Sequence, residues 1–133
     1  MSDLNIVKWT ISLLSTSFIY LFGEFDIALQ TLLLFIVFDY ITGMMKSYKS
    51  SILNSHKGIK GILKKIGLLL LVAVSYKVDQ IAGDSGLIRT TIIYYLAANE
   101  GLSILENLAQ LGIVVPDFLK ERLEQLRDKG DQN

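Results

Sequence analysis

Six polar side chains recur at helical spacing in residues 94–114, YYLAANEGLSILENLAQLGIV. They are carboxylates, amides and one hydroxyl, groups that bind water, ions or one another. On a helix of 3.6 residues per turn most of them fall on one side. The set, called the polar stripe, is Asn99, Glu100, Ser103, Glu106, Asn107 and Gln110. It predicts a surface that lines water or meets another subunit.

The sequence does not indicate catalysis or metal binding. The chain has no Cys, which excludes disulfides and thiolate metal sites. Its single His56 lies in a Ser- and Lys-rich connection typical of solvated surface. The GIKG of residues 58–61 lacks the Lys-Ser/Thr of a phosphate loop, and there is no Gly-x-Ser-x-Gly. We therefore expect a protein without enzyme activity, metal or cofactor.

The composition indicates a membrane protein. Of 133 residues, 51% are hydrophobic and one is Pro, and the mean hydropathy is +0.44, which is high for a soluble domain of this size. Thirteen basic and thirteen acidic residues cancel, so no bulk positive charge points to nucleic acid.

Four apolar segments, at residues 6–22, 27–45, 62–81 and 87–115, approach or exceed the ~20 helical residues that cross a bilayer. The runs LLLFIVF and LLLLVAV show no polar face, unlike helices of a soluble bundle. The predicted fold is all-α, a small multi-pass membrane protein with three to four transmembrane helices in residues 1–115. A position along the membrane interface is the alternative for the first and fourth segments.

Charge placement predicts the orientation. The connection between the second and third segments contains six lysines and no acid, which favours the cytoplasm. These lysines are Lys46, Lys49, Lys57, Lys60, Lys64 and Lys65. Acidic residues mark the opposite turns, with Glu24 and Asp26 in one and Asp79 and Asp84 at the other. Both termini are then expected inside, and no small-x-small cleavage site follows Phe22.

Residues 116–133 predict a short cytoplasmic amphipathic helix. Pro116 interrupts the preceding segment and suits the first turn of a new helix. Apolar residues then recur at helical spacing at Phe118, Leu119, Leu123 and Leu126. We expect this tail to serve oligomerisation or surface binding.

Asp39 and Lys77 are charged residues within apolar segments, where ionisable groups are functional candidates. Asp39 lies within helical reach of Lys64 or Lys65 and is expected either to pair with one of them or to act in gating. Lys77 is expected either to extend toward the membrane surface or to pair with Glu100.

The polar stripe is costly in lipid, so it must face water, other subunits or the membrane surface. Self-association would bring several polar stripes together around one hydrophilic lumen, with the apolar faces of the helices turned outward to the lipid. A helix lying on the membrane surface is the alternative.

Three runs carry a resemblance to a known family: FDYITG (residues 38–43), KGIKGILKK (57–65) and YYLAANEGLSILENLAQLGIVVPDFLKERLEQL (94–126). Over residues 28–128 the chain closely resembles the toxin secretion/phage lysis holin family. The resemblance implies a homo-oligomer in the lipid bilayer of the host bacterial cytoplasmic membrane, which makes lesions at a set time and lets an endolysin escape without direct contact. It places the family's polar signature on Asn99, Glu100, Ser103, Glu106 and Asn107, and its acidic position on Asp39.

Two other functions remain open from the sequence. One is a narrow ion or solute channel, or a component of a toxin-release pore. The other is a membrane-bound assembly factor that docks a cytoplasmic partner on the lysine-rich connection.

Overall fold

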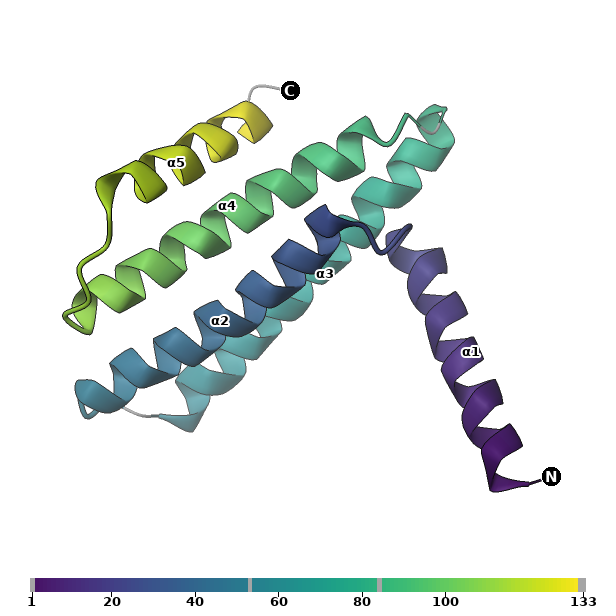
Figure 1. Ribbon diagram of the computed structural model, residues 1–133, viewed down its shortest axis with the longest axis horizontal. Coiled ribbons are helices and arrows are strands. Elements are labelled where there is room, and N and C mark those ends of the chain that lie inside the picture. The colour runs from purple at the N-terminus through teal and green to yellow at the C-terminus, as the bar shows by residue number, and fades with distance from the viewer. Residues whose placement is uncertain (1, 53, 84, 132–133) are drawn as a thin grey trace.

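The computed structural model describes residues 2–52, 54–83 and 85–131, and in these ranges all regular structure is helical (Figure 1). The predicted all-α fold is therefore confirmed. The helices are α1 (Asp3–Phe22), α2 (Ile27–Lys49), α3 (Ser55–Ala82), α4 (Leu87–Gln110) and α5 (Asp117–Asp131). Asp84, expected in an outer turn, lies outside the described residues.

The helix ends follow capping residues rather than the limits of the apolar runs. The Asp26 side chain accepts a 2.9 Å hydrogen bond from the Leu29 amide and starts α2. The Asn54 side chain does the same for the His56 amide, so α3 begins at Ser55 and much of the lysine-rich connection is helical. The fourth helix ends at Gln110, before Gly112 at φ 91°, and not at Val115.

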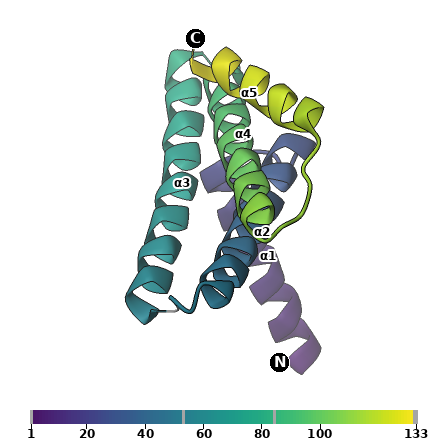
Figure 2. The same ribbon diagram turned by 90° about the vertical axis from the view of Figure 1, so that its left-hand side faces the viewer.

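Helix α4 is the centre of the bundle and packs against α2, α3 and α5 (Figure 2). Helices α2 and α4 run parallel: Arg89 meets Asp26 where both begin, and Lys49 meets the Gln110 carbonyl where both end. Helix α3 runs antiparallel to them. The buried apolar cluster between these three helices comprises Leu29, Leu32, Ile36, Val72, Ile93, Leu96 and Ala97.

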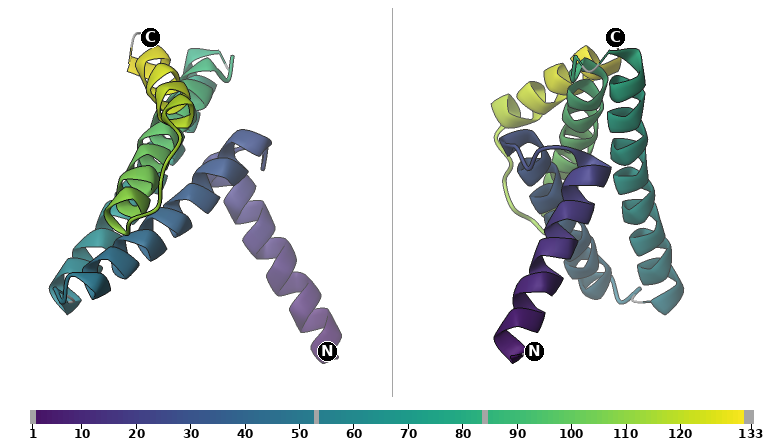
Figure 3. Two further views of the ribbon diagram at one scale, coloured as in Figure 1. Left: turned by 60° about the vertical axis from the view of Figure 1, so that its left-hand side comes forward. Right: turned by 90° about the vertical axis from the view of Figure 1, so that its right-hand side faces the viewer.

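Helix α1 projects away from the bundle (Figure 3). It has no buried residue, and most of its apolar side chains are exposed, Trp9 by 70% and Leu13 by 69%. Only its C-terminal end touches the bundle, where Phe18 and Phe22 are half-buried against the apolar cluster. The rest of such a helix suits lipid. By length and composition α1 and α2 are, among the described helices, the two that could cross a membrane. Helix α3 carries more charge than these two helices, and α4 is less apolar because of its polar stripe.

Helix α5 folds back along α4 instead of extending as a separate tail (Figure 1). Two glycines allow the close approach. A Cβ on Gly101 of α4 would lie 2.9 Å from a Leu123 methyl of α5 and 3.1 Å from the Phe35 ring of α2. A Cβ on Gly130 would lie 2.7 Å from Cβ of Tyr95. Phe118 and Leu119, by contrast, remain exposed.

We expect Gly101→Ala to loosen α5, because the added methyl group displaces the Leu123 side chain of α5 and crowds the Phe35 ring of α2. Amide hydrogen exchange over α5 should rise by about tenfold or more, a cost of at least ~1.4 kcal/mol. The control is Gly67→Ala in α3, where a Cβ meets nothing within 4 Å. Unchanged exchange of α5 in Gly101→Ala would contradict the tight contact.

Candidate functional site

Three charged side chains from three helices meet inside the bundle. Lys65 of α3 forms ion pairs with Asp39 of α2 and Glu100 of α4, and the three side chains are 12%, 13% and 6% exposed. We call this set the ion triad. Two carboxylates and one ammonium group leave it with a formal charge of −1. Buried charges of this kind are stable only when paired and hydrogen-bonded.

The ion triad lies at one level of the bundle. Asp39 precedes Lys49 by ten residues, Lys65 follows Ser55 by ten, and Glu100 precedes Gln110 by ten. Each is therefore ~15 Å along its helix from the lysine-rich end.

Asn107 of α4 gives Asp39 an uncharged partner. It lies between the ion triad and the lysine-rich end of the bundle. Its side-chain amide donates to an Asp39 carboxylate oxygen at 3.2 Å and to the Thr42 hydroxyl at 3.1 Å. Thr42 in turn donates to the Phe38 carbonyl at 2.8 Å. The structure thus uses two members of the polar stripe, Glu100 and Asn107, for contacts within one chain.

The other four members of the stripe form what we call the outer row: Asn99, Ser103, Glu106 and Gln110. At 100° per residue this row is centred roughly 90° around α4 from Glu100 and Asn107. Glu106 and Gln110 are exposed, and Asn99 and Ser103 are half-buried. Among the described residues none of these four side chains makes an ion pair or a hydrogen bond. The outer row is therefore the polar surface of α4 that is left without a partner.

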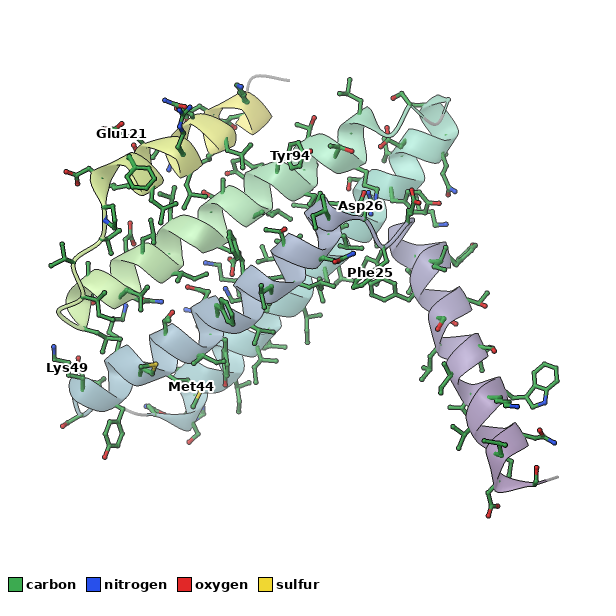
Figure 4. The ribbon with its side chains drawn as sticks, viewed as in Figure 1. Phe25, Asp26, Met44, Lys49, Tyr94 and Glu121 are labelled. Carbon is green, nitrogen blue, oxygen red and sulfur yellow. The ribbon has the colours of Figure 1, made fainter. Side chains whose placement is uncertain are left out.

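A second polar cluster closes the opposite end of the bundle, near Asp26 in Figure 4. The Arg89 guanidinium donates to the Phe22 carbonyl at 2.6 Å, to the Glu24 carbonyl at 2.8 Å and to the Asp26 carboxylate at 2.8 Å. The Asp79 carboxylate of α3 accepts from the Ile88 and Arg89 amides at 3.1 and 2.6 Å. An acid from α3 thus caps the positively polarised start of α4.

We expect Arg89→Gln to lower the free energy of unfolding by about 2 to 3 kcal/mol, because three charge-assisted contacts to the α1–α2 link are lost. Arg89→Lys should be intermediate, since it keeps the charge without the planar fork of donors. Urea denaturation in mild detergent measures both. Equal stability of all three proteins would show that this cluster does not tie the link to α4.

The Asp26 carboxyl group makes the contribution of this cluster to stability depend on pH. Burial opposes ionisation of Asp26, but hydrogen bonds from Arg89 and from the Leu29 amide outweigh it and lower the pKa of the carboxyl group. A carboxyl whose pKa is lower in the folded state stabilises the fold above its ordinary pKa of 3.8 and loses this effect as the pH falls through the lowered value.

We accordingly expect the stability difference between the natural protein and Asp26→Asn to be constant from about pH 7 to pH 5 and to shrink below pH 3.8. Denaturation at several pH values measures it. Glu24→Gln keeps the backbone carbonyl that Arg89 binds and is the matched control. A difference that persists unchanged at about pH 2 would refute the assignment to the Asp26 carboxylate.

The remaining predicted charges are distributed along α2 and α3. Lys77 does not pair with Glu100, which Lys65 occupies; its ammonium group lies 3.7 Å from the centre of the Tyr20 ring and 3.1 Å from Gln80. Among the lysines of the connection, Lys65 enters the ion triad and Lys49 donates to the Gln110 carbonyl at 3.2 Å, at the end of α2 marked in Figure 4. In the described part of the chain the others make no ion pair, namely Lys46, Lys57, Lys60 and Lys64.

Arg89, Asp79 and Thr42 were not predicted as site residues. The signal for Arg89 was its place three residues into a long apolar segment, where an arginine needs partners. Asp79, ten residues earlier and across a glycine-containing turn, was the available acid. Thr42 gave no signal beyond its position three residues after Asp39.

The profile of the Bacteriophage holin family matches residues 16–128. A protein of Bacillus phage phi105 named "Probable holin" is 36% identical over 113 residues, covering 85% of this chain and 83% of the relative. An uncharacterized 14.9 kDa protein from the nagH 3′ region of Clostridium perfringens is 45% identical, covering 95% of this chain and 96% of the relative. The uncharacterized protein Lmo0128 of Listeria monocytogenes is 44% identical, over 86% of this chain and 82% of the relative. No solved structure matches significantly.

The family match covers most of the helical bundle, including the ion triad, the outer row and nearly all of α5. Two of the described helices are long and apolar enough to cross a membrane, as expected for a small membrane protein of this kind. The chain belongs to the bacteriophage holin family.

Proposed function

We propose that this holin accumulates in the host cytoplasmic membrane, assembles into oligomers and forms lesions through which an endolysin escapes, causing lysis at a set time. No catalytic step is required. The observation that carries the proposal is the outer row: four polar side chains without partners, on the central helix of an apolar bundle.

The polar-stripe residues outside the outer row explain why a single chain would not damage the membrane. Glu100 and Asn107 would be costly in hydrocarbon, but Lys65, Asp39 and Thr42 satisfy them within one chain. The monomer can therefore accumulate with these groups sheltered.

The outer row accounts for assembly. Its amides, hydroxyl and carboxylate gain hydrogen bonds only from water or from another chain. Contacts between membrane helices through such groups contribute roughly 0.6 to 2 kcal/mol each. Above a threshold concentration, several copies that turn this row toward a common centre would enclose a hydrophilic lumen.

The placement of charges supports the proposed orientation. The lysine-rich ends of α2 and α3 lie together at one end of the bundle, and Asp26 and Asp79 lie at the other. We propose that α2, α3 and α4 cross the membrane with the lysine-rich end in the cytoplasm, and that α1 brings the N-terminus to the same side.

In this orientation the charged helix α5 cannot stay on α4 during membrane crossing. It contains nine charged residues, and its Gly130 lies against Tyr95, well toward the outer end of α4. Hydrocarbon does not accommodate such a helix beside α4. We propose that α5 leaves α4 before α4 crosses the membrane fully, and then forms the cytoplasmic amphipathic tail of residues 116–133. Gly101→Ala, which loosens α5, should then bring lysis forward.

The proposal is tested by inducible expression in bacteria with and without a co-expressed endolysin. We expect an abrupt stop of respiration after a delay, followed by lysis and release of a cytoplasmic reporter enzyme only with the endolysin. Steady growth with abundant membrane-inserted protein would contradict the proposal. Ion conductance without release of a folded enzyme would instead favour a narrow channel.

A further inference from the structure

A cavity of about 600 Å³ opens between the C-terminal half of α2 and the N-terminal half of α3. Of the outer row only Ser103 is among the residues that line it. Contacts between α2 and α3 are sparse compared with those that each makes with α4. Tyr40 reaches across this space: its hydroxyl lies 3.6 Å from the position of a Cβ on Gly58, and its ring 3.6 Å from that on Gly61. Gly58 and Gly61 of α3 thus face Tyr40 of α2.

The cavity is strongly positive. Lys46, Lys57 and Lys64 line it, and none of them forms an ion pair with a described residue. The one acid in the lining, Asp39, is engaged by Lys65 and Asn107. Lys46 is half-buried, whereas Lys57 and Lys64 are exposed at the open side of the cavity. Three uncompensated ammonium groups around one open cavity attract an anion.

The rest of the lining is amphiphilic. Ser47, Asn54 and Ser55 offer small polar groups, while Met44, Ile59 and Ile62 offer apolar walls. A free phosphate ion would use only the polar part. A lipid uses both, because its phosphodiester needs cations and donors and its glycerol and first methylenes need apolar contact.

We propose that the α2–α3 cavity is a binding site for the headgroup of an anionic phospholipid. The lysines hold the phosphodiester, and the acyl chains leave sideways between α2 and α3. This inference rests on the proposed orientation, which places the lysine-rich ends of α2 and α3 on the cytoplasmic side. Basic pockets between membrane helices on that side are a setting in which anionic lipids are recognised. The lipid bridges the two helices that the protein itself joins weakly, so it acts as a structural part of the monomer.

Native mass spectrometry of the full chain in mild detergent tests this site with four probes: phosphatidylglycerol, cardiolipin, phosphatidylcholine and inorganic phosphate. The test variant is Lys46→Gln/Lys57→Gln. The matched control is Lys49→Gln/Lys60→Gln, which removes the same charge from the same two helices, one turn away and outside the cavity lining. A third variant, Gly58→Leu, fills the space without changing charge.

We expect the natural protein and the matched control to retain phosphatidylglycerol and cardiolipin in preference to phosphatidylcholine. The test variant should lose about 30-fold in affinity for the anionic lipids, about fivefold for each lysine, and Gly58→Leu should lose at least about tenfold. Equal binding of phosphatidylcholine, or an equal loss in the matched control, would overturn the site. Inorganic phosphate that competes fully with lipid would overturn the lipid assignment. None of these outcomes depends on lysis.

Discussion

Replacing Lys65 with Met is expected to lower the free energy of unfolding by about 3 to 5 kcal/mol, the largest effect of any single substitution outside the apolar cluster. The Lys65 ammonium group is the cation that Asp39 and Glu100 share, and all three side chains are buried. Without it two carboxylates would face each other in the bundle, and one or both must take up a proton or draw in water. Urea denaturation in mild detergent, followed by circular dichroism, measures the loss.

Two further variants separate charge pairing from packing. Lys64→Met removes the neighbouring exposed lysine and should leave stability within about 0.5 kcal/mol of the natural protein. The triple variant Asp39→Asn/Lys65→Met/Glu100→Gln removes the whole triad and should recover most of the loss, since no uncompensated charge remains. A triple variant as unstable as Lys65→Met would mean that the charges are not what holds α2, α3 and α4 together.

Replacing both Glu106 and Gln110 with Leu is expected to leave insertion and accumulation intact but to slow the release of a cytoplasmic reporter by about tenfold or more. Both side chains are exposed on α4, and neither makes an ion pair or a hydrogen bond with a residue that the structure describes. The fold loses no contact, whereas each assembled copy loses two polar groups, each contributing roughly 0.6 to 2 kcal/mol. Reporter release against time after induction, at matched protein levels, gives the result.

Tyr94→Leu, an exposed position of α4 outside the polar stripe, is the matched control and should release the reporter at the normal time. Asn107→Leu should behave differently again, because it leaves Asp39 and Thr42 without their amide partner and so destabilises the monomer. Normal release by Glu106→Leu/Gln110→Leu would remove the outer row from the mechanism.

Much of the fold could be predicted from the sequence because local patterns determine it. The apolar runs predicted α2 and α3, and α2 begins at Ile27 as expected. Helix α3 begins at Ser55, seven residues before the predicted start at 62, because Asn54 caps it. The six lysines of the connection, with no acid among them and with acids at the opposite turns, are also a purely local signal. It predicted which helix ends lie at the same end of the bundle, and the lysine-rich ends of α2 and α3 do lie together.

The division of the polar stripe could not be predicted in the same way. Glu106 and Asn107 are adjacent in sequence, and each suits a polar face by spacing. Which one turns inward depends on what α2 presents at that level, and Thr42 and Asp39 lie there. Likewise, the amphipathic pattern of α5 predicted a helix, but its docking on α4 depends on Gly101 and Gly130 meeting neighbours far away in sequence.

Cysteine labelling in living cells tests most directly whether assembly gives the outer row its new surroundings. The chain contains no Cys, so Glu106→Cys and Asn107→Cys each provide a single label site. With a membrane-impermeant maleimide at sub-lethal and lethal expression levels, we expect reactivity at position 106 to change sharply at the onset of lysis. Equal reactivity at position 106 at both levels, whether high or low, would contradict the account.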